Sequence, residues 1–370
     1  MGKKLFFLLF LIQFVNAQEL ALVKKDGRFG YLNKKGEFAI QPQYKTAKNF
    51  SDGLAAAEDN GKWGFINPKG DWAIPATFDN AKYFDSGLCV VQKDKVWYYI
   101  NKKGEKVTAP TTDKVYDFED GIAFIKIGDK VGFINSKMDV VQTPKYDLIK
   151  SFEDGYARVK NNDRWGIIDK TGKVVVEIIY DEIGNYYKGT TWAKNGTAFG
   201  LVSGGKFIAV DGADKIWDFY NQDLTYARKA GRIGFIDLKG NWVIEPKFDK
   251  AKAFYKNLAP VCIGKKWGYV NQKGTLVIEP AYNDAEVFSA DGLAPVKQEK
   301  WGFINADGKM VIPTQYDITA GGLFSIFKDD EKGFVDGLAR VKNEKKWGFL
   351  KTDGTVLGSQ WFENAENFQK

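Results

Sequence analysis

The sequence repeats itself every 34 residues along almost its whole length. Trp-Gly pairs mark the repeat, and degenerate copies of the pair keep the same phase. The ten copies are Phe29-Gly30, Trp63-Gly64, Trp97-Tyr98, Val131-Gly132, Trp165-Gly166, Phe199-Gly200, Ile233-Gly234, Trp267-Gly268, Trp301-Gly302 and Trp347-Gly348. Every step between them is 34 residues except the last, which is 46. A chain with such a period folds as a tandem array of small, similar units.

Each unit has the pattern of three short β-strands. In the second unit they are residues 54–58, 63–67 and 71–74, separated by the turn signals Asn60-Gly61 and Lys69-Gly70. Pro75 follows the third strand, and because proline cannot donate to a sheet ladder, we expect it to end that strand. The stretch 78–84 that follows is expected to be a loop or one turn of helix.

One unit is too small to bury its own aromatic residues, so neighbouring units must stack and share a core. The phased tryptophans are therefore expected to be core anchors. We predict an all-β fold of about ten tandem three-stranded β-meander repeats of 34 residues in an open solenoid-like or superhelical array. The alternative is a closed ring like a β-propeller, which we rank second because propellers usually have about four to eight blades of four strands.

The repeating pattern K-W-G-F-I-N-x-K-G, followed by V-I-x-P and later by F-x-D-G-L-A, resembles the bacterial WG-repeat (KWG-repeat) family. It is most complete over residues 62–91 and 300–313, and the resemblance extends from about residue 19 to 368. It implies a β-repeat protein, often exported or surface-associated, with no catalytic residues to carry over. More distantly, the aromatic and glycine-rich hairpins look like bacterial cell-wall-binding repeats, which implies glycan contact.

The first residues have the order of a signal peptide. Lys3 and Lys4 precede an apolar run over 5–15, and Val15 and Ala17 are small enough for a cleavage site. We therefore predict a signal peptide at 1–17, export to the periplasm, cell surface or medium, and a repeat array over 18–370. The run is too short to span a bilayer, so no membrane span is expected in the mature chain.

The composition excludes several classes of chemistry. The chain has no histidine and two cysteines, Cys89 and Cys262, so histidine-dependent catalysis and Cys-rich metal sites are absent. We expect both thiols to be unpaired, no metal, no cofactor and no enzymatic activity. A glycoside hydrolase built on two carboxylates is kept as a remote alternative. The lysines are scattered rather than clustered, so no nucleic-acid partner is expected, and we predict a monomer.

Two regions that break the repeat are the candidate binding sites. Between 186 and 226, Trp192 and Trp217 stand outside the usual aromatic positions and are candidates for a stacking platform. A 12-residue insertion within 319–332 carries Phe324 and Phe327. We expect this insertion to fold back as a lid over the last units, with presentation of the two phenylalanines to a partner as the alternative. The predicted function is an exported scaffold that binds another protein or a cell-surface component, with glycan binding as the alternative.

Overall fold

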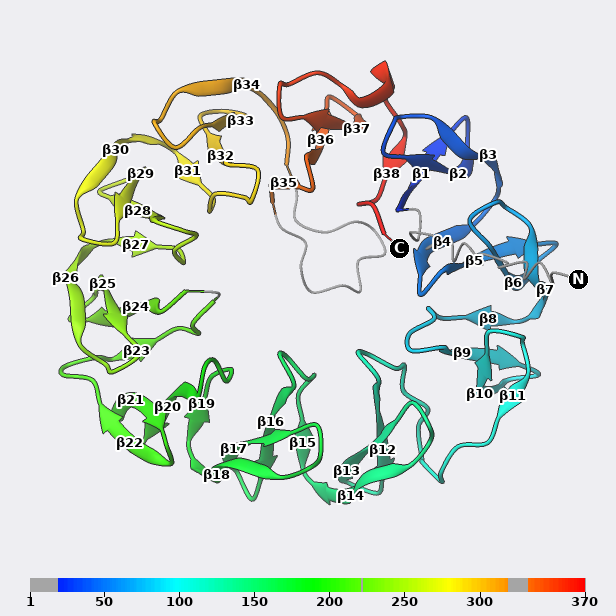
Figure 1. The fold of residues 1–370 in the computed structure, drawn as a ribbon, viewed down its shortest axis with the longest axis horizontal. Helices are drawn as coiled ribbons and strands as arrows, with labels where there is room; N and C mark the ends of the chain where they lie inside the picture. Colours follow the sequence, from blue (N-terminus) through cyan, green and yellow to red (C-terminus); the bar gives the residue numbers. More distant parts are fainter. Residues whose placement is uncertain (1–18, 221, 319–331, 370) are drawn as a thin grey trace, which may run out of the picture.

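The computed structural model describes residues 19–220, 222–318 and 332–369. These residues form ten small antiparallel sheets, which follow one another as blades around a closed ring (Figure 1). The all-β fold and the ten units are thus confirmed, and the closed propeller, the alternative to the open array, is the arrangement observed. The helical structure of the described residues is limited to the short 3-10 turn η1 (Leu357–Ser359).

Eight blades have four strands and two have three. From inner to outer strand, blades 1 to 5 are β38 (Asn364–Ala365), β1 (Leu20–Lys25), β2 (Arg28–Asn33), β3 (Phe38–Tyr44); β4 (Ala47–Ser51), β5 (Leu54–Asp59), β6 (Lys62–Ile66), β7 (Trp72–Phe78); β8 (Asn80–Ala81), β9 (Leu88–Lys93), β10 (Val96–Asn101), β11 (Lys106–Val107); β12 (Ile122–Ile127), β13 (Lys130–Asn135), β14 (Val140–Tyr146); and β15 (Leu148–Ile149), β16 (Tyr156–Asn161), β17 (Arg164–Asp169), β18 (Val174–Tyr180). Blades 6 to 10 are β19 (Glu182–Ile183), β20 (Thr190–Asn195), β21 (Ala198–Ser203), β22 (Lys206–Ala209); β23 (Lys215–Ile216), β24 (Leu224–Lys229), β25 (Arg232–Asp237), β26 (Trp242–Phe248); β27 (Lys250–Ala251), β28 (Leu258–Ile263), β29 (Lys266–Asn271), β30 (Leu276–Tyr282); β31 (Asp284–Ala285), β32 (Ala294–Lys297), β33 (Trp301–Ile304), β34 (Met310–Tyr316); and β35 (Phe334–Val335), β36 (Leu338–Asn343), β37 (Lys346–Lys351).

The innermost strand, which was not among the sequence predictions, is only two residues long in most blades, although β4 of blade 2 has five, and it lies where the sequence pattern indicates a loop. In blade 3, β8 pairs with β9 through Asn80 opposite Gln92 and Ala81 opposite Val91. Two residues are too few to show the alternation that identifies a strand from sequence. This short strand completes the blade, so the 34-residue unit does contain the four strands of a propeller.

The outer strand of a blade continues past its proline instead of ending there. β7 runs through Pro75, and its pairing with β6 shifts in register between Trp63, opposite Phe78, and Phe65, opposite Ile74. The extra residues form a bulge at the exposed edge of the blade, where a missing N–H costs no ladder bond. The prediction that Pro75 terminates the strand is therefore wrong.

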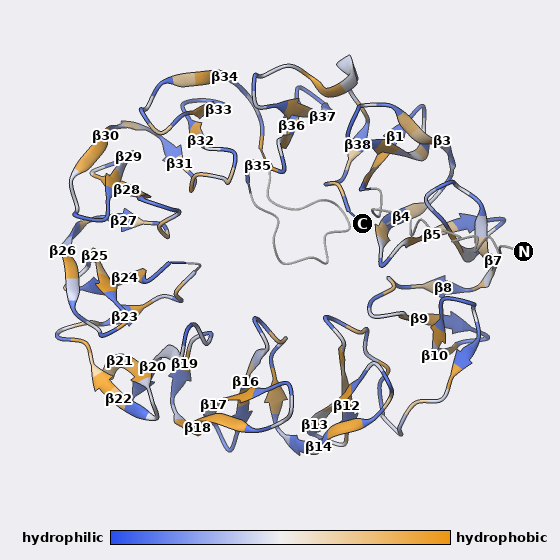
Figure 2. Ribbon diagram, in the orientation of Figure 1, coloured by the Kyte–Doolittle hydropathy of each residue, from blue (hydrophilic) through white to orange (hydrophobic). Residues whose placement is uncertain are grey.

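The core lies within and between the blades. The aromatic residue two positions after the Trp position is buried and packs edge-on against an aromatic of the next blade, as Phe65 does against Phe84 with ring centroids 4.7 Å apart. Such contacts recur around the ring, for example between Tyr31 and Phe50 at 4.8 Å. Figure 2 shows the hydrophobic residues concentrated along the strands, whereas the loops that point toward the centre are largely hydrophilic.

The ring is closed by the last residues of the chain. β38 pairs with β1 through Ala365 opposite Val23, and Leu20 and Gln369 exchange backbone hydrogen bonds of 2.8 and 3.0 Å. An open array would leave the edge of β1 unpaired, although residues 20 to 23 are all buried and apolar. Closure therefore supplies the cover that an open array would need from a separate polar cap.

A buried ion pair joins blade 10 to this closing strand. The side chains of Arg340 and Glu366 are 4% and 2% exposed, and their Nη1 and Oε2 atoms are 3.4 Å apart. The Arg340 guanidinium also donates to the Ala365 carbonyl oxygen at 3.1 Å and lies over the Trp347 ring at 4.7 Å.

The remaining sequence predictions have different outcomes. Cys89 and Cys262 are both free and buried, which confirms the prediction of unpaired thiols. The predicted signal peptide at 1–17 and the insertion residues 319–331, with Phe324 and Phe327, lie outside the described residues. The described part of the chain contains no helix of the length and hydrophobicity needed to cross a membrane.

Candidate functional site

The turns between the first two strands of the blades point toward the centre of the ring (Figure 1). In seven blades this turn follows an aromatic anchor and ends in glycine, as in Phe84-Asp85-Ser86-Gly87, whereas Asp223 and Asn257 take the place of the glycine in blades 7 and 8. Ser86 and Gly87 have φ values of 53° and 82°, which is the geometry of a tight hairpin turn that favours Gly, Asn and Asp. Because Asp is favoured in such turns, the repeat places carboxylates at the inner tips of the blades.

Side-chain hydrogen bonds join neighbouring turns into one surface. The Asp52 carboxylate accepts the Gly87 N–H at 2.6 Å, and the Asp85 carboxylate accepts the Asp120 N–H at 3.1 Å. The Ser51 hydroxyl donates to the Phe84 carbonyl oxygen at 2.7 Å. These bonds fix the turns of consecutive blades relative to one another.

This surface is hollowed into a cavity of about 780 Å³ that extends across the inner turns of six consecutive blades, from blade 2 to blade 7. Six carboxylates line it, together with four tyrosines, four phenylalanines, one serine and one asparagine, and no lysine or arginine. Its lining residues are Ser51, Tyr83, Phe84, Asp85, Asp117, Phe118, Glu119, Asp120, Phe152, Glu153, Asp154, Asn185, Tyr186, Tyr187, Phe219 and Tyr220. We call this feature the inner acidic cavity.

Several of these carboxylates also support the cavity wall. Glu153 accepts a hydrogen bond from the Asn185 amide, and Asp120 forms an ion pair with Lys170. Among the described residues, no group of three or more Cys, Asp or Glu side chains is placed to hold a metal ion. The arrangement is suited to attracting a cationic partner rather than to chelation.

Asp117 differs from the other carboxylates in its surroundings. It is open to the cavity, but protein atoms crowd it, and this loss of bulk water raises the pKa of its carboxyl even though Lys82 and Lys48 act in the opposite direction. Lys48 is largely engaged elsewhere, since its Nζ donates to the Ala81 carbonyl oxygen at 2.6 Å and lies 5.2 Å from the Trp63 ring centroid. Burial raises the pKa of the nearby Tyr83 to about 12, so its hydroxyl stays protonated at neutral pH.

Trp192, one of the two predicted stacking residues, is half-buried in blade 6. Its indole N–H donates to the Asp218 carboxylate at 2.6 Å, and the same oxygen accepts the Asn185 N–H at 2.9 Å. Gly184 makes room for this bond, because a Cβ there would lie 2.1 Å from the Trp192 Nε1 atom. The hydrogen bond fixes the ring within the wall between two blades.

Trp217, the other candidate, is also half-buried. Its ring stacks on Tyr226 at a centroid distance of 4.7 Å and an interplanar angle of 25°. The residues of this irregular region that line the inner acidic cavity are three tyrosines and Phe219 instead. Tyr187 stacks on Phe219 with an interplanar angle of 5°, and Tyr220 is 52% exposed.

The inner acidic cavity was not among the sequence predictions. Its signal is a carboxylate that recurs every 34 residues at Asp85, Glu119 and Glu153. In the linear sequence these residues belong to separate turns, and turn chemistry alone accounts for each one. Only the lateral contact of consecutive turns brings them into one cavity.

These features define a closed ten-bladed β-propeller with an acidic and aromatic inner face. The profile of the family described as "WG containing repeat" matches eight segments of the chain, at 29–63, 63–97, 99–130, 132–165, 165–196, 233–267, 267–300 and 301–319. The chain belongs to this family, as the resemblance in the sequence indicated. A search of curated proteins gives no match.

Solved structures show likeness in fold alone. A crystal structure described as that of the eukaryotic initiation factor is 10% identical, with a TM-score of 0.50, and the match covers 95% of this chain and 97% of that one. Kluyveromyces lactis Hsv2 is 9% identical over 63% of this chain and 87% of its own, with a TM-score of 0.31. PorZ of Porphyromonas gingivalis, described as a bacterial surface component of the type-IX secretion system, is 9% identical over 90% and 55%, with a TM-score of 0.26.

Proposed function

We propose that this protein is an exported, non-catalytic scaffold that binds a basic segment of a partner protein on the inner side of its ring. The observation that carries the proposal is the inner acidic cavity, whose lining has six carboxylates and no basic side chain. Export is proposed from the signal-peptide pattern of residues 1–17.

The chemistry of the cavity suits arginine and lysine side chains. A concave surface that carries charge of one sign attracts opposite charge and increases association rates. Tyrosine rings at the same surface bind cations through their faces, which contributes about 0.5–2 kcal/mol per contact. Tyr220, which is 52% exposed, supplies such a ring in a lining that also includes Glu153 and Asp154, whereas the Tyr187 ring already has the Lys188 Nζ atom 5.2 Å from its centroid.

The non-catalytic assignment is supported by the structural role of the carboxylates that line the cavity. Asp85 and Glu153 accept hydrogen bonds from the neighbouring turn, so they hold the blades in place. The second candidate is a carboxylate-dependent glycoside hydrolase, which the raised pKa of Asp117 favours because a general acid must stay protonated. Turnover of polysaccharide by the purified protein, lost in Asp117→Asn, would establish this candidate instead.

Fluorescence anisotropy with labelled nona-arginine and nona-glutamate peptides tests the binding proposal. We expect binding of the arginine peptide only, weakening as NaCl is raised, and at least tenfold weaker binding by the double variant Asp117→Asn/Asp154→Asn. The matched control is Asp94→Asn/Asp129→Asn, which removes the same charge from two turns outside the cavity. Equal loss in both double variants would show that net charge rather than the cavity causes binding.

A further inference from the structure

A bridging carboxylate recurs at the junctions between blades, sixteen residues after the Trp position. In the second unit, Asp79 pairs with Lys62 at 2.6 Å through one oxygen and accepts the Asp94 N–H at 2.7 Å through the other. The carboxylate therefore joins the basic residue that precedes the Trp position to the hairpin turn of the next blade. The same three-part contact is made by Lys130, Asp147 and Asn162, by Arg164, Asp181 and Gly196, and by Arg232, Asp249 and Gly264.

The first junction lacks this carboxylate, because Lys45 stands at its position. Arg28, the basic residue before the Trp position, and Lys45 have no ion-pair partner among the described residues, and the Asn60 N–H has no acceptor there. In one other unit a lysine, Lys215, also replaces the bridging carboxylate. That unit has only one of the two cations, because Ala198 occupies the position before the Trp position, where Arg28 stands in the first unit. The first junction alone thus combines two exposed cations with a turn N–H that elsewhere binds a carboxylate.

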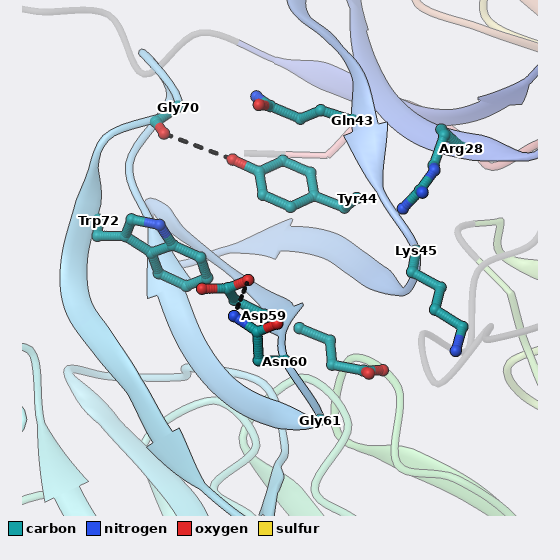
Figure 3. A pocket seen from close by; sticks show the side chains of 10 residues that line it. Arg28, Gln43, Tyr44, Lys45, Asp59, Asn60, Gly61, Gly70 and Trp72 are labelled. Atoms are coloured by element: carbon teal, nitrogen blue, oxygen red, sulfur yellow. Dashed lines mark hydrogen bonds between the residues drawn. The ribbon is translucent and has the colours of Figure 1, made fainter.

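The space at this junction is a pocket of about 640 Å³. Figure 3 shows Arg28 and Lys45 along one side of the pocket and Trp72 on the other, with Tyr44 between them. Trp72 is 39% exposed and meets the Tyr44 ring nearly at a right angle, with the centroids 6.3 Å apart. Gln43, Glu58 and Asp59 add polar acceptors to the wall.

We propose that this pocket binds a uronic acid residue of an acidic polysaccharide. The sugar carboxylate takes the place of the missing bridging carboxylate, between Arg28, Lys45 and the Asn60 N–H, where charge-assisted hydrogen bonds are strong. The apolar face of the pyranose lies against the exposed Trp72 indole. Its hydroxyl groups donate to Glu58 and Gln43, which line the same wall.

An acidic peptide shares the carboxylate but fits the rest of the pocket less well. A glutamate side chain has no hydroxyl groups to donate to Glu58 and Asp59, and it leaves the Trp72 surface uncovered. The sugar therefore satisfies both the cationic and the acidic parts of the wall. The pocket shares no lining residue with the inner acidic cavity, so the proposal of uronic acid binding does not depend on the proposed protein partner.

The variant Lys45→Asp tests the proposal, because it restores the bridging carboxylate that the other junctions have. Isothermal titration with tri-galacturonate and a hyaluronan tetrasaccharide is expected to show binding of at least one uronide by the wild type and none of neutral maltotriose. Lys45→Asp is expected to weaken uronide binding at least tenfold while raising the melting temperature. Lys103→Asp makes the same charge change at another exposed turn and is expected to change neither.

The variant Trp72→Ala distinguishes the carboxylate of a sugar from that of an acidic peptide. Uronide binding is expected to fall at least fivefold in this variant, and a hexaglutamate peptide is expected not to bind. Binding of hexaglutamate that Trp72→Ala leaves unchanged would overturn the sugar assignment, and absence of binding by any uronide would overturn the site. Nona-arginine binding is expected to be the same in Lys45→Asp as in the wild type, so failure of one proposal is distinguishable from failure of the other.

Discussion

Gly64 lies directly against the bulge of its own outer strand, and a Cβ on it would stand 2.6 Å from the Ile74 carbonyl oxygen and 2.6 Å from the Ala76 nitrogen. In all seven units whose outer strand is seven residues long, the equivalent glycine has a similarly close approach to the backbone of that strand. The third unit has Tyr98 at this position, and its outer strand β11 is only two residues long. The glycine of the Trp-Gly pair is therefore required for the long outer strand rather than for the tryptophan beside it.

We expect Gly64→Ala to destabilise the protein by about 1–3 kcal/mol, because the new methyl group has only backbone atoms to displace. Hydrogen exchange of β7 is expected to accelerate in the same variant. The control is Tyr98→Ala, which has no bulged strand to displace and is expected to leave exchange in β11 unchanged. Unchanged melting and exchange in Gly64→Ala would contradict this account of the pair.

Breaking the buried ion pair at the ring closure is expected to be costly. Arg340→Met leaves Glu366 ionised and buried, which costs about 3–5 kcal/mol by analogy with other buried pairs. The double variant Arg340→Met/Glu366→Leu removes both charges and is expected to recover most of the loss. Urea unfolding of the two variants and the wild type measures the difference, and a double variant as unstable as the single one would argue against charge burial as the cause.

We expect removal of the Asp117 carboxyl group to stabilise the folded protein, by an amount that depends on pH. Its pKa is raised in the folded protein, so ionisation of Asp117 opposes folding above that pKa. The cost disappears as the pH falls below the unfolded-state pKa of about 3.9. Asp117→Asn is therefore expected to melt at a higher temperature than the wild type at pH 7, with a difference that shrinks toward pH 4. A difference that is constant with pH would contradict the assignment, and Asp129→Asn serves as the charge-matched control.

Both thiols are expected to be unreactive in the native protein. Burial raises the pKa of the Cys89 thiol and, to a smaller degree, that of Cys262, and thiolate is the reactive form. A thiol reagent at pH 8 should modify neither in the folded state and both in denaturant. Rapid native labelling of Cys89 would show that the blade 3 core opens more readily than its packing implies.

The sequence was sufficient for the repeat but not for the shape of the whole. Ten β units can be recognised from the spacing of the Trp position, the glycine turns and the aromatic anchors. These features are visible in the sequence because they serve contacts within one unit or between one unit and the next. Closure depends on Ala365 meeting Val23, a contact between the two ends of the chain that no local pattern encodes. The inner acidic cavity was missed for a related reason, since Asp85 and Glu153 come together only when their turns stack.

Lys45 illustrates the opposite case. It is visible in the sequence as a lysine where most units have Asp, Asn or Glu. Its meaning required the structure, because only the contact of Asp79 with both Lys62 and the Asp94 N–H shows what that position does.

The pairing of β38 with β1 also determines when the ring can close during synthesis of the chain. A ribosome delivers β1 long before β38, so the apolar edge of blade 1 has no native partner until residues 364–365 have been made. During that time the edge is a template for pairing with other chains. A chain that lacks residues 364–369 contains every Trp position yet leaves this edge open, so closure of the ring and not the number of repeats decides whether the edge is exposed.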